Sequence, residues 1–271
     1  MCIIDEREEV APMGPKEQLA RWIEESPQWV FFGGAGVSTE SGIPDFRSEN
    51  GLYRQKFAYP PEVMLSRTFF DAHPREFFDF YRKKMIAPGA RPNAAHKALA
   101  AWEKQGRGVC VVTQNIDGLH QMAGSRRVWE LHGSVHRNFC MHCGKEYPLS
   151  FIQESQGIPR CSCGGIVKPD VVLYEEGLLE SVLNGAVRDI AKADLLIVAG
   201  TSLTVYPAAG LLQAFSGRHM VVINRTPTPA DKKADLLFSE PVGQVLEEVA
   251  KLLEGSISSK SHKGQKEAFY D

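Results

Sequence analysis

The segment "VFFGGAGVSTESGIPDFR", from Val30 to Arg47, decides the fold of this chain. An apolar run leads into Gly33, Gly34 and Gly36, as a buried strand does where it passes into a nucleotide-binding turn. Glycines let the backbone approach a phosphate closely, with the N–H groups of the next helix pointing at it. A glycine turn can also simply join a strand to a helix, so the turn alone leaves nucleotide binding open. No acidic residue ends a strand about twenty positions later, which disfavours an ordinary NAD dehydrogenase.

Short apolar runs of the same kind recur, each ending in polar or glycine-containing sequence, as buried parallel strands do. They lie at residues 29–34, 109–115, 194–202 and 220–226. Helix-like stretches alternate with them, at 16–26, 93–106 and 243–255. This alternation predicts an α/β fold, a Rossmann-like open parallel sheet with helices on both faces.

Four of the six cysteines gather in one segment, spaced Cys140-x2-Cys143-x17-Cys161-x-Cys163. Thiolates on two facing turns can complete a tetrahedral Zn²⁺ site, and four of them leave no position for water or substrate. We therefore predict a structural zinc ion, although the second pair has one spacer residue where two are usual. Four free thiols are the alternative, and His142 could replace a cysteine as ligand.

Two regions interrupt the alternation and predict a smaller lobe beside the sheet. Residues 48–90 look helical and residues 133–176 hold the cysteines, so we expect a helical insertion and a zinc-binding module. The Rossmann-like domain would then consist of residues 16–47, 91–132 and 177–254. Residues 255–271 are polar and rich in serine and lysine, which predicts a disordered tail.

The charge of the chain excludes some function classes. The formal net charge is −2 over 271 residues, which provides no strong attraction to nucleic acid or acidic membranes. Acidic residues near the N-terminus, among them Asp5 and Glu9, argue against a secretory signal, and no apolar run is long enough to span a bilayer. We expect a cytoplasmic protein without direct nucleic-acid or membrane partners.

Polar side chains follow the second apolar run, in "TQNIDGLH". Gln114, Asn115 and Asp117 stand where open sheets bind ligands. Capping of a helix N-terminus could account for one of them but less readily for three. A little further on, His132 in "ELHGSVH" is a candidate general base, because histidine titrates near neutrality. Spacing does not choose it over His120, His136 or His142.

Together these pieces resemble the sirtuin family of NAD-dependent protein deacylases. The matching motifs are "GAGVSTESGIPDFR", "TQNIDGLH", "ELHGSV", the four cysteines, "KPDVVLYEE", "GTSLTVYPAAGL" and "VVINRT". They follow the family's order over roughly residues 16–245, and their combination resembles the deacetylase type of bacteria. The resemblance implies that the glycine turn holds an NAD⁺ that is consumed as a co-substrate.

The resemblance also implies roles for individual residues. Ala35, Gly36 and Thr39 would line the phosphate and ribose path, and Phe46 and Arg47 would lie near the nicotinamide ribose and the phosphates. Gln114 and Asn115 would contact the nicotinamide ribose, and Ile116 and Asp117 would receive the carboxamide. Thr201, Ser202, Asn224 and Val242 would hold the adenosine. Gly34 and Gly200 complete the expected cofactor set, and His132, Asn115 and Asp117 form the expected catalytic set.

The implied activity is NAD⁺-dependent protein-lysine deacetylation. Nicotinamide leaves the ribose, and the acyl oxygen attacks that sugar carbon. His132 then removes a proton from a ribose hydroxyl, which attacks the acyl carbon, and water completes the exchange to give O-acetyl-ADP-ribose and free lysine. The acetyl-lysine peptide would bind as an added strand between residues 171–175 and 202–206. Glu175 stands where the family commonly has glycine, and it either favours basic peptides or is merely solvated.

Acyl preference and activity leave alternatives. Relatives that remove succinyl or malonyl groups carry a Tyr-x-x-Arg pair, and an ungapped reading places Phe78 and Tyr81 there. Without an arginine a buried acyl carboxylate lacks its partner, which favours acetyl, but Arg82 lies one position away. A desuccinylase or other deacylase, a mono-ADP-ribosyltransferase and a non-catalytic NAD sensor are the alternatives.

Overall fold

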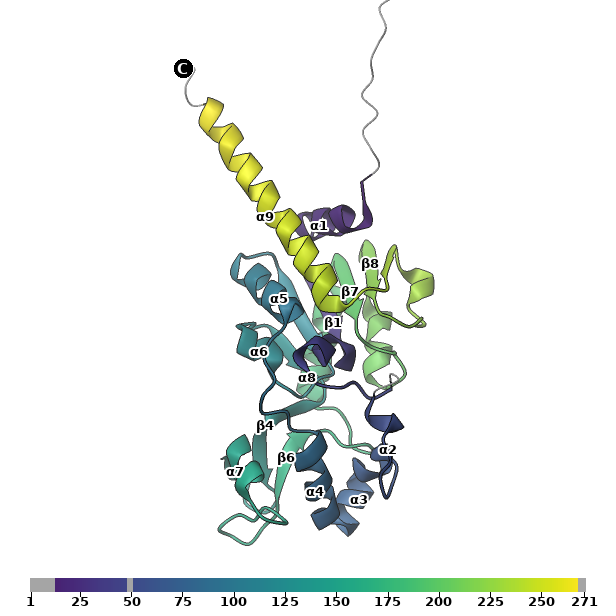
Figure 1. Cartoon of the computed structure of the whole chain (residues 1–271), viewed down its shortest axis with the longest axis vertical. Helices are drawn as coiled ribbons and strands as arrows, with labels where there is room; N and C mark the ends of the chain where they lie inside the picture. The colour runs from purple at the N-terminus through teal and green to yellow at the C-terminus, as the bar shows by residue number, and fades with distance from the viewer. Residues whose placement is uncertain (1–12, 48–50, 268–271) are drawn as a thin grey trace, which may run out of the picture.

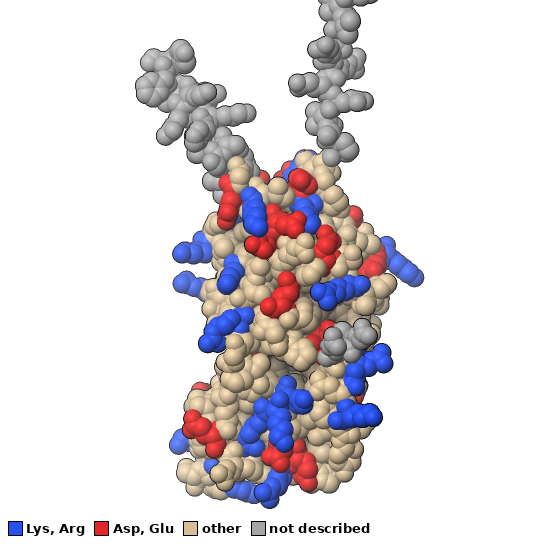
Figure 2. Space-filling model, viewed as in Figure 1, with Lys and Arg blue, Asp and Glu red and all other residues tan. Residues whose placement is uncertain are grey.

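The protein has a sheet domain and a smaller lobe, arranged one above the other in Figure 1. The structure is a computed structural model that describes residues 13–47 and 51–267, with 256–267 as backbone only. Charged side chains of both signs are interspersed over the sheet domain on the face seen in Figure 2. Among the described residues, no helix is both long and apolar enough to cross a membrane.

The sheet domain is built on six parallel strands in the order β3-β2-β1-β7-β8-β9. The strands are β1 (Trp29–Gly33), β2 (Val109–Thr113), β3 (Val128–Glu130), β7 (Leu195–Ala199), β8 (His219–Ile223) and β9 (Leu236–Phe238). The four apolar runs are therefore confirmed as strands. Gly33 pairs with Thr113 on one side and with Ala199 on the other, so the loops that follow three strands meet at one edge.

Helices cover both faces of the sheet. Alternate residues of a strand point to opposite sides, and here both sets are apolar, so each face packs against helices. Phe31, Val111 and Ile197 pack with one helical layer, and Phe32, Val112 and Val198 pack with the other. The first layer holds α1 (Pro15–Glu25), α5 (Ala94–Lys104) and α9 (Val242–Glu267); the second holds α8 (Glu180–Ala191) and the 3₁₀ helix η3 (Ala208–Ala214). The predicted open α/β sheet with two helical layers is confirmed.

The smaller lobe combines the two insertions around one apolar core. The first supplies η2 (Leu52–Arg54), α2 (Pro61–Met64), α3 (Arg67–Ala72) and α4 (Pro74–Lys84). The second supplies α7 (Leu149–Glu154) and an antiparallel sheet in the order β5-β4-β6, formed by Glu146–Pro148, Gly133–Cys140 and Val167–Val171. Phe70 and Phe77 from the first insertion are fully buried in the same cluster as Val135 and Ile152 from the second.

Backbone pairing also joins the two insertions beyond that core. The N–H of Tyr174 donates to the Leu65 carbonyl, and the N–H of Arg67 donates to the Tyr174 carbonyl, both at 3.0 Å. The next residue, Glu175, has a φ of 75°, where glycine is favoured. Its carboxylate accepts hydrogen bonds from the backbone N–H and the hydroxyl of Thr68.

The C-terminal helix is longer than the sequence suggested. Helix α9 continues to Glu267, so residues 255–267 are helical where we expected a disordered tail. Val245, Leu246, Val249 and Leu253 pack the first turns against the sheet domain. Once a helix has been nucleated in this way, each further residue adds a hydrogen bond, and no proline interrupts residues 242–267. Residues 268–271 lie outside the described residues.

Candidate active site

A cavity of about 880 Å³ opens where the carboxyl ends of the parallel strands face the smaller lobe. Its lining includes all the residues that the sequence predicted for cofactor binding and catalysis. These are Gly34, Ala35, Gly36, Thr39, Phe46, Arg47, Gln114, Asn115, Ile116, Asp117, His132, Gly200, Thr201, Ser202, Asn224 and Val242. Segments from six parts of the chain thus meet around one space, and the individual roles of these residues stay predictions.

The glycine turn packs directly against the loop after β7. The N–H of Gly36 donates to the Gly200 carbonyl at 2.8 Å, and a Cβ at position 36 would lie 2.7 Å from the Gly200 Cα. A Cβ at position 34 would lie 2.7 Å from the Thr201 Cβ. These two glycines are therefore required for the contact between two loops, in addition to any approach to a phosphate.

A buried hydrogen-bonded chain joins the turn to the loop after β2. The Ser38 hydroxyl donates to Asp117 Oδ2 at 2.7 Å, and Asn115 Nδ2 donates to the Ser38 hydroxyl at 3.0 Å. Asp117 Oδ1 also accepts the N–H of Leu119, the first residue of α6 (Leu119–Ala123), whose N-cap is Gly118. The same side chain thus holds the start of this helix and lines the cavity. The sequence reasoning missed Ser38, although it lies inside the motif that decided the fold.

A second link crosses the cavity floor at the ends of β2 and β7. Gln114 Nε2 donates to the Thr201 hydroxyl at 3.0 Å, and the same hydroxyl accepts the Leu203 N–H. The polar side chains at this edge are therefore held in place by one another. Asn224, further along the edge, donates through Nδ2 to the Thr226 carbonyl at 2.7 Å.

His132 lies between β3 and β4, at the passage from the sheet domain to the smaller lobe. Its Nδ1 is 2.8 Å from the Gln114 carbonyl oxygen. A carbonyl only accepts, so Nδ1 carries the proton and Nε2 keeps a lone pair. Burial lowers the pKa of His132, and the Gln114 carbonyl partly offsets that shift. The ring is thus a neutral base at neutral pH.

The structure separates His132 from the competing histidines. His120 is 1% exposed and packs against His96, outside the cavity lining. His136 lines the cavity, but its Nε2 lies 3.0 Å from the Asp117 carbonyl, to which it can donate. His142 is exposed in the cysteine module. Among these candidates, His132 alone combines partial burial, a fixed tautomer and a place in the lining.

The loop after the glycine turn brings an aromatic ring and a cation to the rim. Phe46 packs edge-on to Tyr53, with centroids 5.6 Å apart, and the Arg47 guanidinium lies 5.2 Å from the same ring. Arg47 also donates its backbone N–H to the Asp45 carboxylate. Both side chains can therefore be presented to a ligand from this loop.

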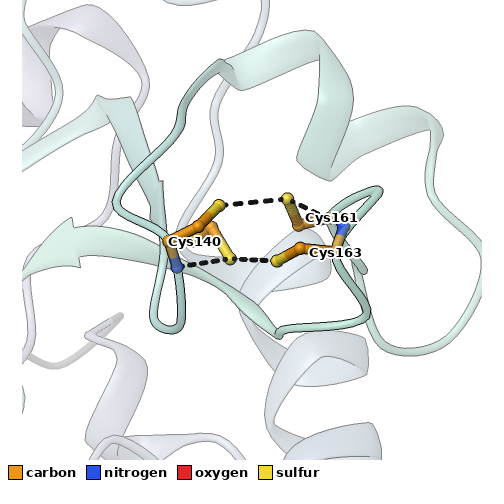
Figure 3. A group of neighbouring side chains, drawn as sticks. Cys140, Cys161 and Cys163 are labelled. Carbon is orange, nitrogen blue, oxygen red and sulfur yellow. Dashed lines mark hydrogen bonds between the residues drawn. The ribbon is translucent and has the colours of Figure 1, made fainter.

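The four cysteines converge within the smaller lobe, and the sulfurs of Cys140, Cys161 and Cys163 point toward one another in Figure 3. All four ligand atoms lie within 4.8 Å of one another, with Sγ–Sγ distances of 3.4 Å for Cys140–Cys163 and 3.6 Å for Cys143–Cys161. Zn–S bonds of about 2.3 Å in a tetrahedron place sulfurs about 3.8 Å apart. Four cysteines at these distances fit one structural Zn²⁺.

Backbone N–H groups further prepare two of these sulfurs, those of Cys140 and Cys161, to bind a cation. The N–H of Cys143 lowers the pKa of the Cys140 thiol, and the N–H of Cys163 lowers that of Cys161 to about 5. The short spacer in the second pair is accommodated by Gly164, with a φ of 86°, and by Gly165. A Cβ on Gly165 would lie 2.8 Å from Cys140 Sγ, so the two turns could not approach with a larger residue.

The acyl-selecting positions differ from the expectation. Phe78 and Tyr81 are fully buried in the core of the smaller lobe, and neither lines the cavity. Arg82 is also turned away, because its guanidinium donates to the carbonyls of Ile152 and Gly157. The ungapped match of Phe78 and Tyr81 to the Tyr-x-x-Arg positions therefore does not bring these side chains to the cavity. Their direction is determined by the packing of α4 against the aromatic core of the smaller lobe.

The fold and this cavity define a Rossmann-like protein with a ligand-sized cavity at the edge of its sheet and a half-buried neutral histidine in its lining. Residues 34–207 match the model of the Sir2 family, and the chain belongs to that family. It is 60% identical over 236 residues to the "NAD-dependent protein deacetylase" of Clostridium acetobutylicum. The aligned region covers 86% of this chain and 96% of that protein.

Two solved Sir2 structures resemble the whole described fold. One is a Sir2 variant with deacetylated p53 peptide and 3'-O-acetyl ADP-ribose, at 37% identity and a TM-score of 0.80, covering 90% of this chain and 98% of that one. The other is Sir2 with p53 peptide and NAD⁺, at 38% identity and a TM-score of 0.77, covering 89% and 98%.

Proposed function

We propose that this protein is an NAD⁺-dependent protein-lysine deacetylase that releases nicotinamide and O-acetyl-ADP-ribose. One observation carries the proposal: a neutral His132, with its tautomer fixed by Gln114, lines the same cavity as the Ser38–Asp117–Asn115 chain and the glycine turn. Relatives named NAD-dependent protein deacetylase and Sir2 structures with NAD⁺ and peptide support the same activity.

The cavity divides into a polar floor and a turn that can hold a dinucleotide. We assign the phosphates and the first ribose to Ala35, Gly36 and Thr39, the nicotinamide end to the loop 114–117, and the adenosine end to the residues that follow β7 and β8. Arg47 contributes the cation that phosphates require at the rim. Asp117 is fixed by Ser38 and by the Leu119 N–H, so it can orient a carboxamide without moving.

His132 acts as the general base. With Nδ1–H held by the Gln114 carbonyl, Nε2 can accept the proton of a ribose hydroxyl, which then attacks the activated acyl carbon. NAD⁺ supplies the ribose that receives the acyl group. Partial burial keeps the pKa of His132 below the ordinary value, so the ring is a neutral base at neutral pH. The cysteine site takes no part in this chemistry and stabilises the smaller lobe.

The acetyl-lysine peptide is assigned to the gap between the segments 171–175 and 202–206. Both contribute to the cavity lining, through Leu173 and Tyr174 on one side and Ser202 and Val205 on the other. Glu175 also lines the cavity, and its exposed carboxylate accepts hydrogen bonds from the backbone N–H and the hydroxyl of Thr68. Backbone pairing of this kind tolerates many sequences around the lysine.

Acetyl is favoured over succinyl by the position of Arg82. Its guanidinium is bound to two carbonyls inside the smaller lobe, so it cannot neutralise a buried acyl carboxylate. Lys84 does line the cavity, but its Nζ donates to Gln55 Oε1 at 2.8 Å in an exposed position. A cytoplasmic location and the absence of a direct nucleic-acid partner stay predictions of the sequence.

Mass spectrometry of the products tests the proposal and separates the alternatives. Wild-type protein is incubated with NAD⁺ and matched acetyl-lysine and succinyl-lysine peptides. Free lysine with O-acetyl-ADP-ribose supports deacetylation, and faster turnover of the succinyl peptide would contradict the acyl assignment. ADP-ribosylated protein would indicate a transferase, whereas unchanged NAD⁺ would indicate a sensor.

A further inference from the structure

A carboxylate outside the cavity lining joins two of the cavity walls. Glu40 lies on η1 (Ala35–Ser41), and its Oε2 accepts the backbone N–H of Gly243 at 2.7 Å. Gly243 is the second residue of α9, 203 positions further along the chain. The hydrogen bond therefore connects the glycine turn with the start of the C-terminal helix.

Both ends of this bond lie next to residues that line the cavity. Thr39 precedes Glu40 and lines the cavity, and Pro241 and Val242 precede Gly243 and also line it. In the proposed function, the first wall holds the phosphates and ribose and the second holds the adenosine. The Glu40–Gly243 hydrogen bond thus ties these two walls to each other.

The local chemistry favours a carboxylate at this position. The first N–H groups of a helix have no partner within the helix, and a negative charge is stabilised beside that positive end. Glycine at position 243 allows a very close approach, because a Cβ there would lie 2.7 Å from Glu40 Oε1. On the side of α1, Lys16 pairs with Glu240 at 3.0 Å and with Glu248 at 2.7 Å. The start of α9 is therefore held from two sides, and the Glu40 hydrogen bond joins it to the turn beside the apolar packing of Val37 against Val242 and Val245.

We propose that Glu40 is a positioning residue for NAD⁺. Resting on the proposed function, the inference is that its carboxylate holds the first turn of α9, with Pro241 and Val242, at the distance from the glycine turn that the dinucleotide spans. Without the carboxylate, the turn and the helix keep their own packing but their relative position relaxes. Affinity for the ADP-ribose part then falls, while the peptide site between residues 171–175 and 202–206 is unaffected.

Binding of ADP-ribose by calorimetry tests the inference without relying on catalysis. Glu40→Ala should raise the Kd for ADP-ribose and the KM for NAD⁺ about tenfold, the effect expected from losing a hydrogen bond to a charged group. The KM for acetyl-lysine peptide should stay unchanged. Glu40→Gln keeps an acceptor oxygen and should recover most of the affinity.

Glu103→Ala is the matched control. Glu103 also accepts backbone N–H groups, from Arg126 and Arg127 at 2.9 and 3.0 Å, but it lies outside the cavity lining. It should lower the melting temperature without changing either KM. Equal ADP-ribose affinity in Glu40→Ala and wild type would overturn the inference, as would an equal rise in both KM values. Wild-type protein that binds ADP-ribose but does not deacetylate would refute the proposed function alone. Wild type without ADP-ribose affinity would refute both.

Discussion

The imidazole of His132 donates from Nδ1 to the carbonyl oxygen of Gln114, 18 positions earlier in the chain, at 2.8 Å. These two residues are neighbours because β2 and β3 pair in parallel, and Gln114 and His132 follow their ends. The sheet topology thus decides which ring nitrogen can act as a base. This relationship leads directly to the first prediction.

His132→Ala should lower kcat for deacetylation by about 10²- to 10⁴-fold, the usual contribution of a general base. In the wild type, kcat/KM should be flat at neutral pH and fall only below about pH 6.5, because burial lowers the pKa of the ring from its ordinary value. Product formation measured by mass spectrometry across pH gives both results. A variant with full activity, or a profile that falls above pH 7, would contradict this role.

Ser38→Ala should lower kcat/KM for NAD⁺ by roughly 5- to 30-fold, because Asp117 and Asn115 each lose a hydrogen-bond partner in a buried chain. Release of nicotinamide, followed by chromatography, is the measurement. The matched control is Ser155→Ala, which removes a hydroxyl that donates to the Phe151 carbonyl on α7 and is not part of the cavity lining. If both variants lose activity equally, the Ser38 contact has no specific function.

One zinc ion per chain should be found by elemental analysis. Cys161→Ser should lose the metal and lower the melting temperature, since the metal ties the turns of residues 140–143 and 161–163 together. Cys110→Ser is the control, because Cys110 lies alone on β2 and bonds Asp189. Retention of zinc by Cys161→Ser would contradict the ligand assignment.

Stability should fall in acid because of the buried pair His96 and His120. Burial lowers the pKa of His96 to about 4 and that of His120 to about 3, with the neighbouring His96 adding to the second shift. Below pH 6.5 the two histidines therefore bind protons in the unfolded chain, whereas in the folded protein they stay neutral until the pH is much lower. The free energy of unfolding should decrease by up to about 1.4 kcal/mol per pH unit for each group between pH 6.5 and 4.

Urea denaturation between pH 4.5 and 7.5 measures this slope. His120→Phe removes one titrating ring and should make the slope shallower, whereas His73→Gln changes an exposed ring and should leave it as in the wild type. Any loss of zinc in acid affects all three proteins alike. Identical slopes in wild type and His120→Phe would show that the buried pair is not responsible.

The sequence predicted the four strands that are five residues long and fully or almost fully buried, because an apolar run is then conspicuous. It missed β3 and β9, which have three residues each and lie at the sheet edges with partial exposure. The antiparallel strand β4 was also hidden, since "GSVHRNFC" mixes polar and apolar residues around a bulge. A strand could thus be predicted from the sequence when it is buried along its whole length.

Site residues were predictable where they lie inside a sequence motif. They were less predictable where their role depends on a contact with a distant segment of the chain. Ser38 gains its function from Asp117, 79 positions away, and no local pattern signals that contact. Phe78 and Tyr81 were misplaced because the sequence gives the helical period of α4 but not the direction in which that helix faces the cavity. The cysteines were easier, since their spacing alone brings two turns together.

The pairing of Tyr174 with Leu65 and Arg67 has a consequence for making chimaeras. The cysteine module and the helical insertion come from separate stretches of the chain, yet each completes the other's backbone hydrogen bonds. A graft that brings either stretch alone from a relative would leave those N–H and carbonyl groups facing an unfamiliar surface. A chimaera should fold when both stretches are taken from the same relative, so the smaller lobe has to be exchanged as one unit.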